Sequence, residues 1–266
     1  MSGEGTRRAA PAGPALPAEV RQVREPEGAG PVPLRVHPDW QVRFPWLMQA
    51  TTGRGDPGDP FDLGLFGDVP VGRAMARWRR VREALGARGA VHARQVHGVE
   101  IRRHDDAAPD GLLVTEGVDG HITGRPGLLL AVSVADCVPV FVVDPERRRV
   151  ALLHGGWRGT AAGIVGRGLE LLGEGAPDRL HVHLGPAICG LCYEVGPEVH
   201  EALGLPVPHA KTPVDVRAVQ ARQAVDAGVP PEHVTVSDHC TRCGSGFFSH
   251  RGGDSGRQMG VLGIRP

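Results

Sequence analysis

The sequence predicts a mixed α/β fold that forms a single domain. In the second half of the chain, short apolar runs typical of strands alternate with segments whose apolar residues recur at helical spacing, which is the pattern of α/β proteins. Of the 266 residues, 41% are hydrophobic, enough for a sizeable core. There is no internal repeat and no clear linker, so we expect one domain rather than two.

The first part of the chain is expected to lie outside the folded domain. Residues 1–33 are rich in Ala, Pro, Gly, Arg and Glu and have no sustained apolar periodicity. Such segments bury too little apolar surface to offset the entropy lost on ordering. We therefore expect a disordered extension over 1–33, a folded domain over 34–266, and a loop at the Gly- and Pro-rich stretch 51–60.

Apolar spacing divides the rest of the chain into elements. The first helix is expected at 71–85, where Ala74, Trp78, Val81 and Leu85 share one face and arginines occupy the other. Strands are expected at 90–96, 112–115, 128–134, 138–143, 150–153, 180–184, 234–236 and 259–264. Further helices are expected at 160–172, 197–203 and 214–227.

Charge and cysteine content narrow the class of protein. The chain has 30 basic and 30 acidic residues, which argues against a dominant basic surface for nucleic acid. It contains neither an apolar run long enough to cross a bilayer nor a signal-peptide pattern. We expect a cytoplasmic protein without membrane or nucleic-acid partners, whose five cysteines are thiols or metal ligands rather than disulfides.

The stretch from Val150 to Thr160 is the first candidate for a functional site. Its apolar strand ends in His154, which is followed by two glycines, Trp157 and Arg158 before a helical pattern begins. Side chains on a sharp turn at a strand end are held by a rigid scaffold and can be directed into a cleft. A lone histidine in such a place is more often structural, so a functional role requires partners elsewhere in the chain.

Three residues together are the candidate metal ligands: His97, Cys137 and His154. Each lies at the end of a predicted strand, with glycine or proline within two residues. Two imidazoles and one thiolate are good zinc ligands, and three protein ligands leave a fourth position for water or substrate, as in catalytic zinc sites. The thiolate also suits copper. The spacing matches no short zinc motif, so the alternative of three separate structural residues stays open.

Two C-x-x-C pairs form a competing metal candidate: Cys189 with Cys192, and Cys240 with Cys243. Four cysteines in two pairs match a structural zinc site, but residues 193–239 separate the pairs, which is longer than the usual loop of about 15–20 residues. The alternative is that Cys192 is a small buried residue beside Tyr193, and that the second pair consists of two neighbouring thiols.

Three arginines are candidates for binding phosphate: Arg158, Arg251 and Arg257. Each lies among glycine, serine or aromatic residues, and a guanidinium group offers a forked set of donors suited to phosphate. Asp136, next to Cys137, is a candidate catalytic acid or base, or a residue that orients a ligand histidine. A solvated arginine and a structural turn aspartate are the alternative interpretations.

Five segments in this order resemble the YfiH-type laccase-domain family, also called the polyphenol oxidase family. They are Arg94-Gln95-Val96-His97-Gly98, Ala135-Asp136-Cys137-Val138-Pro139, His154-Gly155-Gly156-Trp157-Arg158-Gly159, residues 185–195, and Phe247-Phe248-Ser249-His250-Arg251 with Gly256-Arg257. The resemblance runs from about Asp62 to the C-terminus. It implies a compact α/β fold with sheets packed on each other and helices outside, and one zinc bound by His97, Cys137 and His154.

The resemblance also implies an activity. Members of this family are described as purine nucleoside phosphorylases with added adenosine deaminase activity. We therefore predict a zinc enzyme that acts on adenosine, inosine and methylthioadenosine with phosphate as the second substrate. The alternatives are a copper-dependent phenol oxidase, a hydrolase or amidase with Cys137 as nucleophile and His154 as base, and a non-enzymatic interaction domain held by zinc at the C-x-x-C pairs.

Three positions depart from the family's pattern. Gly155 stands where alanine is usual, His121 is an extra histidine in the segment 118–123, and Gly252 replaces the second arginine of the Phe-Phe-Ser-x-Arg-Arg motif. We expect Gly155 to be tolerated on steric grounds. Because His121 is an extra histidine, the contacts that the segment 118–123 makes in the family are not carried over to this chain. If the missing arginine binds phosphate in the family, binding here is weaker or is supplied by Arg257.

Overall fold

Two large β-sheets pack face to face, and helices cover both outer faces. The computed structural model describes residues 15–106 and 109–266. In spatial order, the seven-stranded sheet contains β1 (Arg21–Val23), β14 (Val234–Ser237), β11 (His181–Leu184), β9 (Val138–Asp144), β10 (Arg149–Gly155), β7 (Gly120–Thr123) and β5 (Ile101–Arg103). The six-stranded sheet contains β2 (Leu34–Arg35), β3 (Leu47–Thr52), β15 (Gln258–Ile264), β8 (Leu128–Val134), β4 (Gly89–Arg94) and β6 (Gly111–Glu116).

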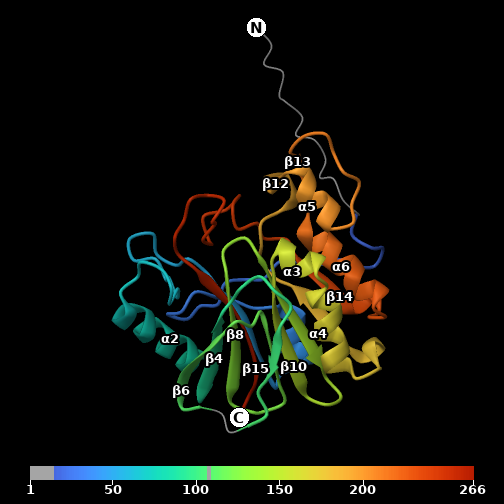
Figure 1. Cartoon of the computed structure of the whole chain (residues 1–266). Helices are drawn as coiled ribbons and strands as arrows, with labels where there is room; N and C mark the ends of the chain where they lie inside the picture. Colours follow the sequence, from blue (N-terminus) through green and yellow to red (C-terminus); the bar gives the residue numbers. More distant parts are fainter. Residues whose placement is uncertain (1–14, 107–108) are drawn as a thin grey trace.

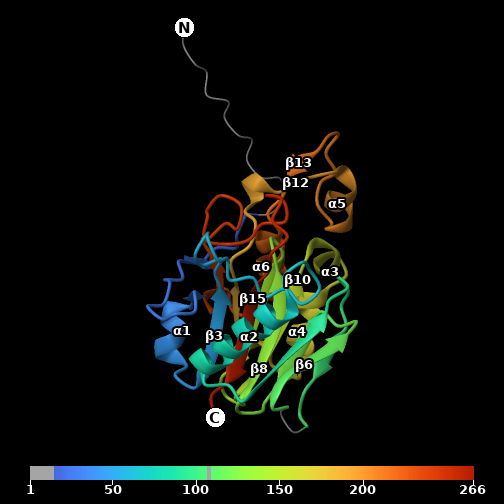
Figure 2. The same cartoon turned by 90° about the vertical axis from the view of Figure 1, so that its left-hand side faces the viewer.

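The helices lie on opposite sides of this pair of sheets. Helix α2 (Val71–Leu85) lies on one side, whereas α4 (Ile164–Gly173) and α6 (Val216–Asp226) lie on the other, as Figures 1 and 2 show. The shorter elements are α1 (Pro38–Arg43), α3 (Trp157–Ala161), α5 (Pro197–Ala202), β12 (Glu194–Val195), β13 (Thr212–Pro213), and the 3-10 turns η1 (Pro177–Arg179), η2 (Gly190–Cys192) and η3 (Pro231–His233).

Alternation along the central strands produces three apolar layers. Successive side chains of a strand point to opposite faces, so Val140 and Val142 of β9 pack towards α4, while Phe141 and Val143 lie in the layer between the sheets. In the same way, Leu129 of β8 lies in the layer with Trp78 of α2, whereas Leu128 and Leu130 lie between the sheets. The predicted mixed α/β architecture with packed sheets and outer helices is confirmed.

Most predicted elements occur within a residue or two of their expected bounds. The helix at 71–85 and the strand at 128–134 occur as predicted. The helix expected at 160–172 is instead two helices, α3 and α4, because Gly163 between them has a φ of 86°. That left-handed conformation is open to glycine and ends a helix.

The prediction of a disordered segment up to residue 33 is wrong for residues 15–33; residues 1–14 lie outside the described part of the chain. Strand β1 pairs with β14 in parallel, and Glu25 is only 1% exposed. A carboxyl buried this deeply needs partners, and Glu25 Oε1 lies 2.7 Å from His183 Nε2 while Oε2 accepts from Ser237 Oγ at 2.8 Å. These partners are distant in sequence, so composition alone does not reveal the ordering.

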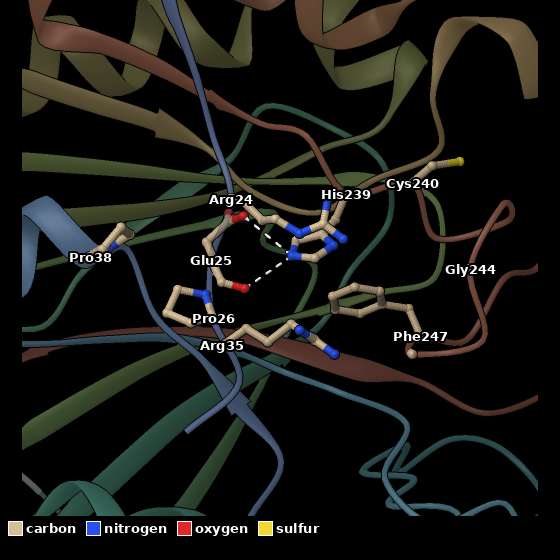
Figure 3. A pocket seen from close by; sticks show the side chains of 10 residues that line it. Arg24, Glu25, Pro26, Arg35, Pro38, His239, Cys240, Gly244 and Phe247 are labelled. Atoms are coloured by element: carbon tan, nitrogen blue, oxygen red, sulfur yellow. Dashed lines mark hydrogen bonds and ion pairs between the residues drawn. The ribbon is translucent and has the colours of Figure 1, made fainter. Parts of the chain in front are cut away.

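The same N-terminal segment forms one wall of a cavity. The cavity has a volume of about 550 Å³, and its lining includes Arg24, Glu25, Arg35, His239 and Phe247. Figure 3 shows Glu25 and His239 facing each other there, and the His239 Nε2 atom lies 3.0 Å from the Glu25 carbonyl oxygen. The segment is thus packed into the domain. Across residues 15–106 and 109–266, none of the helices has the length and apolar character needed to span a bilayer.

Candidate active site

The structure brings His97, Cys137 and His154 together at one end of the pair of sheets. His97 follows β4 of the six-stranded sheet, and His154 lies near the end of β10 in the other sheet. Cys137 lies where the chain crosses from β8 to β9, and therefore from one sheet to the other. The ligand atoms of this trio all lie within 4.8 Å of one another, so two imidazoles and one thiol converge as a zinc site requires.

Asp119, which sequence analysis did not single out, organises the trio. It lies just before β7 and is fully buried. Its Oδ1 lies 2.8 Å from His154 Nδ1 and accepts the backbone N–H of His97 at 2.9 Å. Its Oδ2 accepts the N–H groups of Val96 and Gly98 at 3.1 and 2.8 Å. Occupying Nδ1 leaves the Nε2 atom of His154 free for a metal, which is the usual role of a carboxylate behind a ligand histidine.

The extra histidine beside Asp119 does not disturb these contacts. His121 is buried, and its Nδ1 lies 3.0 Å from His104 Nε2. Burial and the nearby His104 hold the pKa of His121 well below its usual value, so the ring is neutral at physiological pH. The only sequence signal for Asp119 was its place in the segment 118–123.

The backbone at His97 is held in a strained conformation. His97 has a φ of 61°, which is uncommon for a residue with a side chain and costs on the order of 1–3 kcal/mol. The contacts from Asp119 offset this cost. Gln95 adds a second anchor, because its Nε2 donates to Ser133 O at 2.9 Å and its Oε1 accepts from Ser133 N at 2.6 Å. The loop that carries His97 is therefore fastened to β8.

Two glycines after His154 make room for the site. A Cβ atom on Gly156 would lie 3.0 Å from His97 Cδ2 and 3.2 Å from Cys137 Sγ, so only glycine leaves the trio undisturbed. A Cβ on Gly155 would collide with the Gln220 side chain, whose Nε2 donates to Gly155 O at 2.9 Å and Thr160 Oγ1 at 2.7 Å. Glycine is accepted at position 155 because the Gln220 side chain occupies the space that a Cβ atom would take.

The charges around Cys137 favour its thiolate form. Burial acts to raise the pKa of Cys137, but the positive charge of His154 and hydrogen bonds from both histidines outweigh it and lower the pKa to about 6. Burial likewise acts to lower the pKa of His154, but the Cys137 thiolate and Asp119 raise it to about 9. A low thiol pKa suits both metal binding and nucleophilic attack.

Two cavities meet at Cys137. The larger has a volume of about 390 Å³ and contains all three members of the trio together with Arg94, His250 and Arg257. The smaller has a volume of about 40 Å³ and is lined by Cys137, Gly156, Trp157, Ile188 and Tyr193, among others. His97 is exposed whereas His154 is buried, so the trio opens to solvent on the side of His97.

The three candidate arginines differ in their places around these cavities. The Arg158 guanidinium lies 4.3 Å from the centre of the Trp157 ring, and that of Arg251 lies 5.0 Å from the centre of the Tyr193 ring. Trp157 and Tyr193 line the smaller cavity, but neither arginine is among its lining residues. Arg257 lines the larger cavity, where its Nη1 already donates to Ser255 O and Gly256 O, each at 2.8 Å.

Asp136 is engaged by two other segments. Its Oδ1 accepts from Thr241 Oγ1 and its Oδ2 accepts from Arg251 N, both at 2.6 Å. It is 8% exposed and has a φ of 87°. These contacts fix the turn that carries Cys137 and leave neither oxygen without a partner, which favours a positioning role over that of a catalytic acid or base.

The two C-x-x-C pairs also converge, in a second group apart from the trio. The Sγ atoms of Cys189, Cys192, Cys240 and Cys243 all lie within 4.8 Å of one another. The alternative of two unrelated pairs is therefore wrong, because the structure brings both pairs to one point. The two metal candidates do not exclude each other, since the structure forms both.

This fold and these residues place the chain in a known family. Residues 61–265 match the family model described as multi-copper polyphenol oxidoreductase laccase, and the chain belongs to that family. The match covers the trio, Asp119 and the four cysteines.

Relatives and solved structures agree with this assignment. The chain is 38% identical to "Purine nucleoside phosphorylase YlmD" of Geobacillus stearothermophilus over 73% of this chain and 77% of the relative. It is 40% identical to "Adenosine deaminase RL5" of an unknown prokaryotic organism, over 53% of this chain and 60% of that protein. The crystal structure of YlmD superposes with a TM-score of 0.83 and 30% identity, covering 92% of this chain and 100% of YlmD. YfiH of Bacillus licheniformis gives 0.80 and 28%, covering 89% of this chain and 98% of YfiH.

Proposed function

We propose that the chain is a zinc-dependent purine nucleoside phosphorylase that also deaminates adenosine. The observation that carries the proposal is the convergence of His97, Cys137 and His154 at the wall of a cavity of about 390 Å³. A cavity of that size falls in the range that holds small molecules. The names of the relatives YlmD and RL5 support the two reactions.

The donor set fits a catalytic zinc ion. Three protein ligands leave one position open, and Asp119 holds His154 with its Nε2 turned to the trio. A zinc bound there would act as a Lewis acid and would lower the pKa of a bound water towards about 7, as deamination requires. Copper is the alternative metal, because the same thiolate and imidazoles bind it.

Phosphorolysis makes particular demands on the chain's own residues. A phosphate oxygen bonds to the anomeric carbon of the ribose, the bond from that carbon to the purine nitrogen breaks, and its electron pair takes up a proton. Positioning and charge stabilisation then supply most of the rate. We assign the nucleoside to the larger cavity and the phosphate to Arg158 and Arg251, whose guanidinium groups lie over Trp157 and Tyr193, two residues that line the smaller cavity. Arg257 ranks below them because its Nη1 already has two acceptors.

A test with two nucleosides separates the reactions. The zinc-loaded chain is incubated with inosine in the presence and absence of phosphate, and separately with adenosine. We expect hypoxanthine release that requires phosphate, conversion of adenosine to inosine, and loss of both activities in Cys137→Ala. Adenosine and methylthioadenosine, compared at equal concentration with phosphate, measure the preference for the sugar because both carry adenine. Consumption of neither nucleoside would overturn the proposal.

A second candidate rests on one observation, the alignment of Cys137, His154 and Asp119. A thiol with a lowered pKa, a histidine beside it and a carboxylate on the far side of that histidine form the arrangement of a cysteine hydrolase. This metal-free reaction predicts turnover of an amide or ester that survives removal of zinc by a chelator. The copper-dependent phenol oxidase predicts oxidation of a phenol by the copper-loaded chain, with consumption of oxygen.

A further inference from the structure

Four cysteines outside the trio form a compact group, which we call the four-cysteine cluster: Cys189, Cys192, Cys240 and Cys243. Cys243 Sγ lies 3.3 Å from Cys192 Sγ and 3.8 Å from Cys189 Sγ. A zinc–sulfur bond of about 2.3 Å in a tetrahedral site places sulfur atoms about 3.8 Å apart. These two distances, and the limit of 4.8 Å that holds for all four sulfur atoms, are compatible with four sulfurs around one ion.

The backbone around the cluster is already arranged for this geometry. The N–H groups of Cys189 and Cys243 donate to Cys240 Sγ at 3.2 and 3.4 Å, and such donors stabilise negative charge on a sulfur. The segments run side by side, because Ala187 forms a parallel bridge with Cys240. Figure 3 shows the Cys240 side chain directed away from the cavity that contains Glu25.

A disulfide explains this arrangement less well than a metal does. Cys243 is close to two sulfurs that belong to the other pair, and one disulfide could join it to only one of them. Two C-x-x-C pairs are the usual ligand set of structural zinc sites, and thiolates are soft ligands that favour zinc over hard cations.

We propose that the four-cysteine cluster binds one Zn²⁺ as a closed structural site, separate from the trio. Four protein ligands leave no open position for a substrate. The ion would fasten residues 185–195 to residues 238–251. This inference does not rest on the nucleoside chemistry, because it follows from the cluster alone.

Both fastened segments hold Asp136, the neighbour of Cys137. Ile188 N donates to Asp136 O at 3.1 Å, while Thr241 Oγ1 and Arg251 N donate to the Asp136 carboxylate. Arg242 Nη1 also donates to Cys192 O at 3.1 Å. The structural zinc would thus stabilise the turn that places Cys137 in the trio and the wall that carries Tyr193 and Arg251.

Metal content and ligand type test the proposal. The full chain is purified under reducing conditions, and its zinc is measured by elemental analysis. We expect His97→Ala to retain the zinc of the cluster, and X-ray absorption of that variant to show four sulfur ligands at about 2.3 Å. Cys243→Ser, at an exposed position, is expected to lose one zinc per chain relative to wild type. Cys137→Ala is the matched control: any zinc that it loses belongs to the trio, so X-ray absorption of its remaining zinc is expected to show the four sulfur ligands of the cluster.

Two further measurements guard against a variant that does not fold. Cys243→His supplies another zinc ligand, so it is expected to recover the zinc that Cys243→Ser loses. When cobalt replaces zinc in Cys243→His, its visible spectrum is expected to differ from that of cobalt-substituted wild type. Three results would overturn the proposal. They are zinc bound by nitrogen or oxygen in His97→Ala, absence of zinc from that variant, and a lowered intact mass that reveals a disulfide in the reduced wild-type chain. A chain that cleaves no nucleoside would contradict the proposed function but not the proposal of a structural zinc.

Discussion

The Nδ1 atom of His154 lies 2.8 Å from the Oδ1 atom of Asp119, and that same oxygen accepts the backbone N–H of His97 at 2.9 Å. One buried carboxylate therefore sets the ring of one candidate ligand and the backbone of another. Burial acts to raise the pKa of Asp119, but hydrogen bonds from His154 and from Gly98 and Val96 outweigh it and lower the pKa to about 2. Asp119 is thus ionised wherever the protein is folded near neutral pH.

Replacing Asp119 with asparagine is expected to weaken zinc binding at the trio. The amide group keeps one acceptor but lacks the charge and turns an N–H towards a donor. Loss of such a supporting carboxylate typically costs about 10–100-fold in metal affinity. Competition with a chromogenic chelator measures the affinity, and Asp68→Asn, at an exposed position, is the control. Equal zinc affinity in wild type and Asp119→Asn would contradict the role assigned to Asp119.

A methyl group at position 156 is expected to damage the trio while leaving the fold intact. In Gly156→Ala the new Cβ would press on His97 Cδ2 and Cys137 Sγ. Displacement of reacting groups by about 1 Å can cost about 100-fold in rate, so we expect a loss of ~10–100-fold in kcat/KM. Gly72→Ala in α2 is the matched control, because nothing lies within 4 Å of its Cβ. Full activity of Gly156→Ala would show that the trio does not need this space.

The phosphate assignment predicts a selective change in one Michaelis constant. Hydrogen bonds to charged groups contribute about 1.5–3 kcal/mol each, so Arg158→Gln and Arg251→Gln are each expected to raise KM for phosphate by ~10–100-fold. KM for inosine should change less. Arg257→Gln serves as the comparison, since Arg257 lines the other cavity. If Arg257→Gln alone raises KM for phosphate, the phosphate belongs in the larger cavity.

The Glu25–His183 pair is expected to make stability depend on pH. Burial acts to raise the pKa of Glu25, but the hydrogen bond and charge of His183 outweigh it, and the pKa is lowered from 4.5. A group with a lowered folded pKa contributes stability above its unfolded pKa, and this contribution is lost as the pH falls through the folded value. Wild type should therefore exceed Glu25→Gln in unfolding free energy at neutral pH, and the difference should shrink below pH 4.5.

Urea unfolding at a series of pH values measures this difference. Glu19→Gln is the control, since Glu19 is exposed and lies in the same segment. A constant difference between wild type and Glu25→Gln across the acid range would show that His183 does not stabilise the charged form of Glu25. No difference at any pH would show that the Glu25 carboxylate contributes little to the stability of the fold.

Sequence patterns predicted those elements whose apolar spacing is uninterrupted. Strand β8 carries apolar residues on both faces because both are buried, and α2 shows helical spacing over its whole length. Strand β7 was missed, since its buried residues include the polar His121 and Thr123, whose contacts through His121 Nδ1 and Thr123 Oγ1 form only in the folded chain. Strand β1 was missed for a related reason, because it is short and joins a sheet whose other strands are far away in sequence.

The sequence likewise predicted some residues of the candidate site and missed another. Residue types and strand ends identified the three members of the trio, and paired cysteines identified the four-cysteine cluster as an alternative. Spacing along the chain could not show that either group converges, because both are closed by turns from distant strands. Nothing in the local sequence set Asp119 apart from a structural turn aspartate, and its importance follows from four contacts made across the fold.

By itself the sequence determined the α/β class, most strands and helices, and the chemical types of ligand available, since these depend on local periodicity and side-chain chemistry. Only the tertiary structure decided that the N-terminal segment from residue 15 is packed, that Asp119 contacts two candidate ligands, and that the side chains of both metal candidates converge. The physical reason is that a metal site or a buried charge depends on distances between groups far apart in the chain, and packing of the two sheets sets those distances.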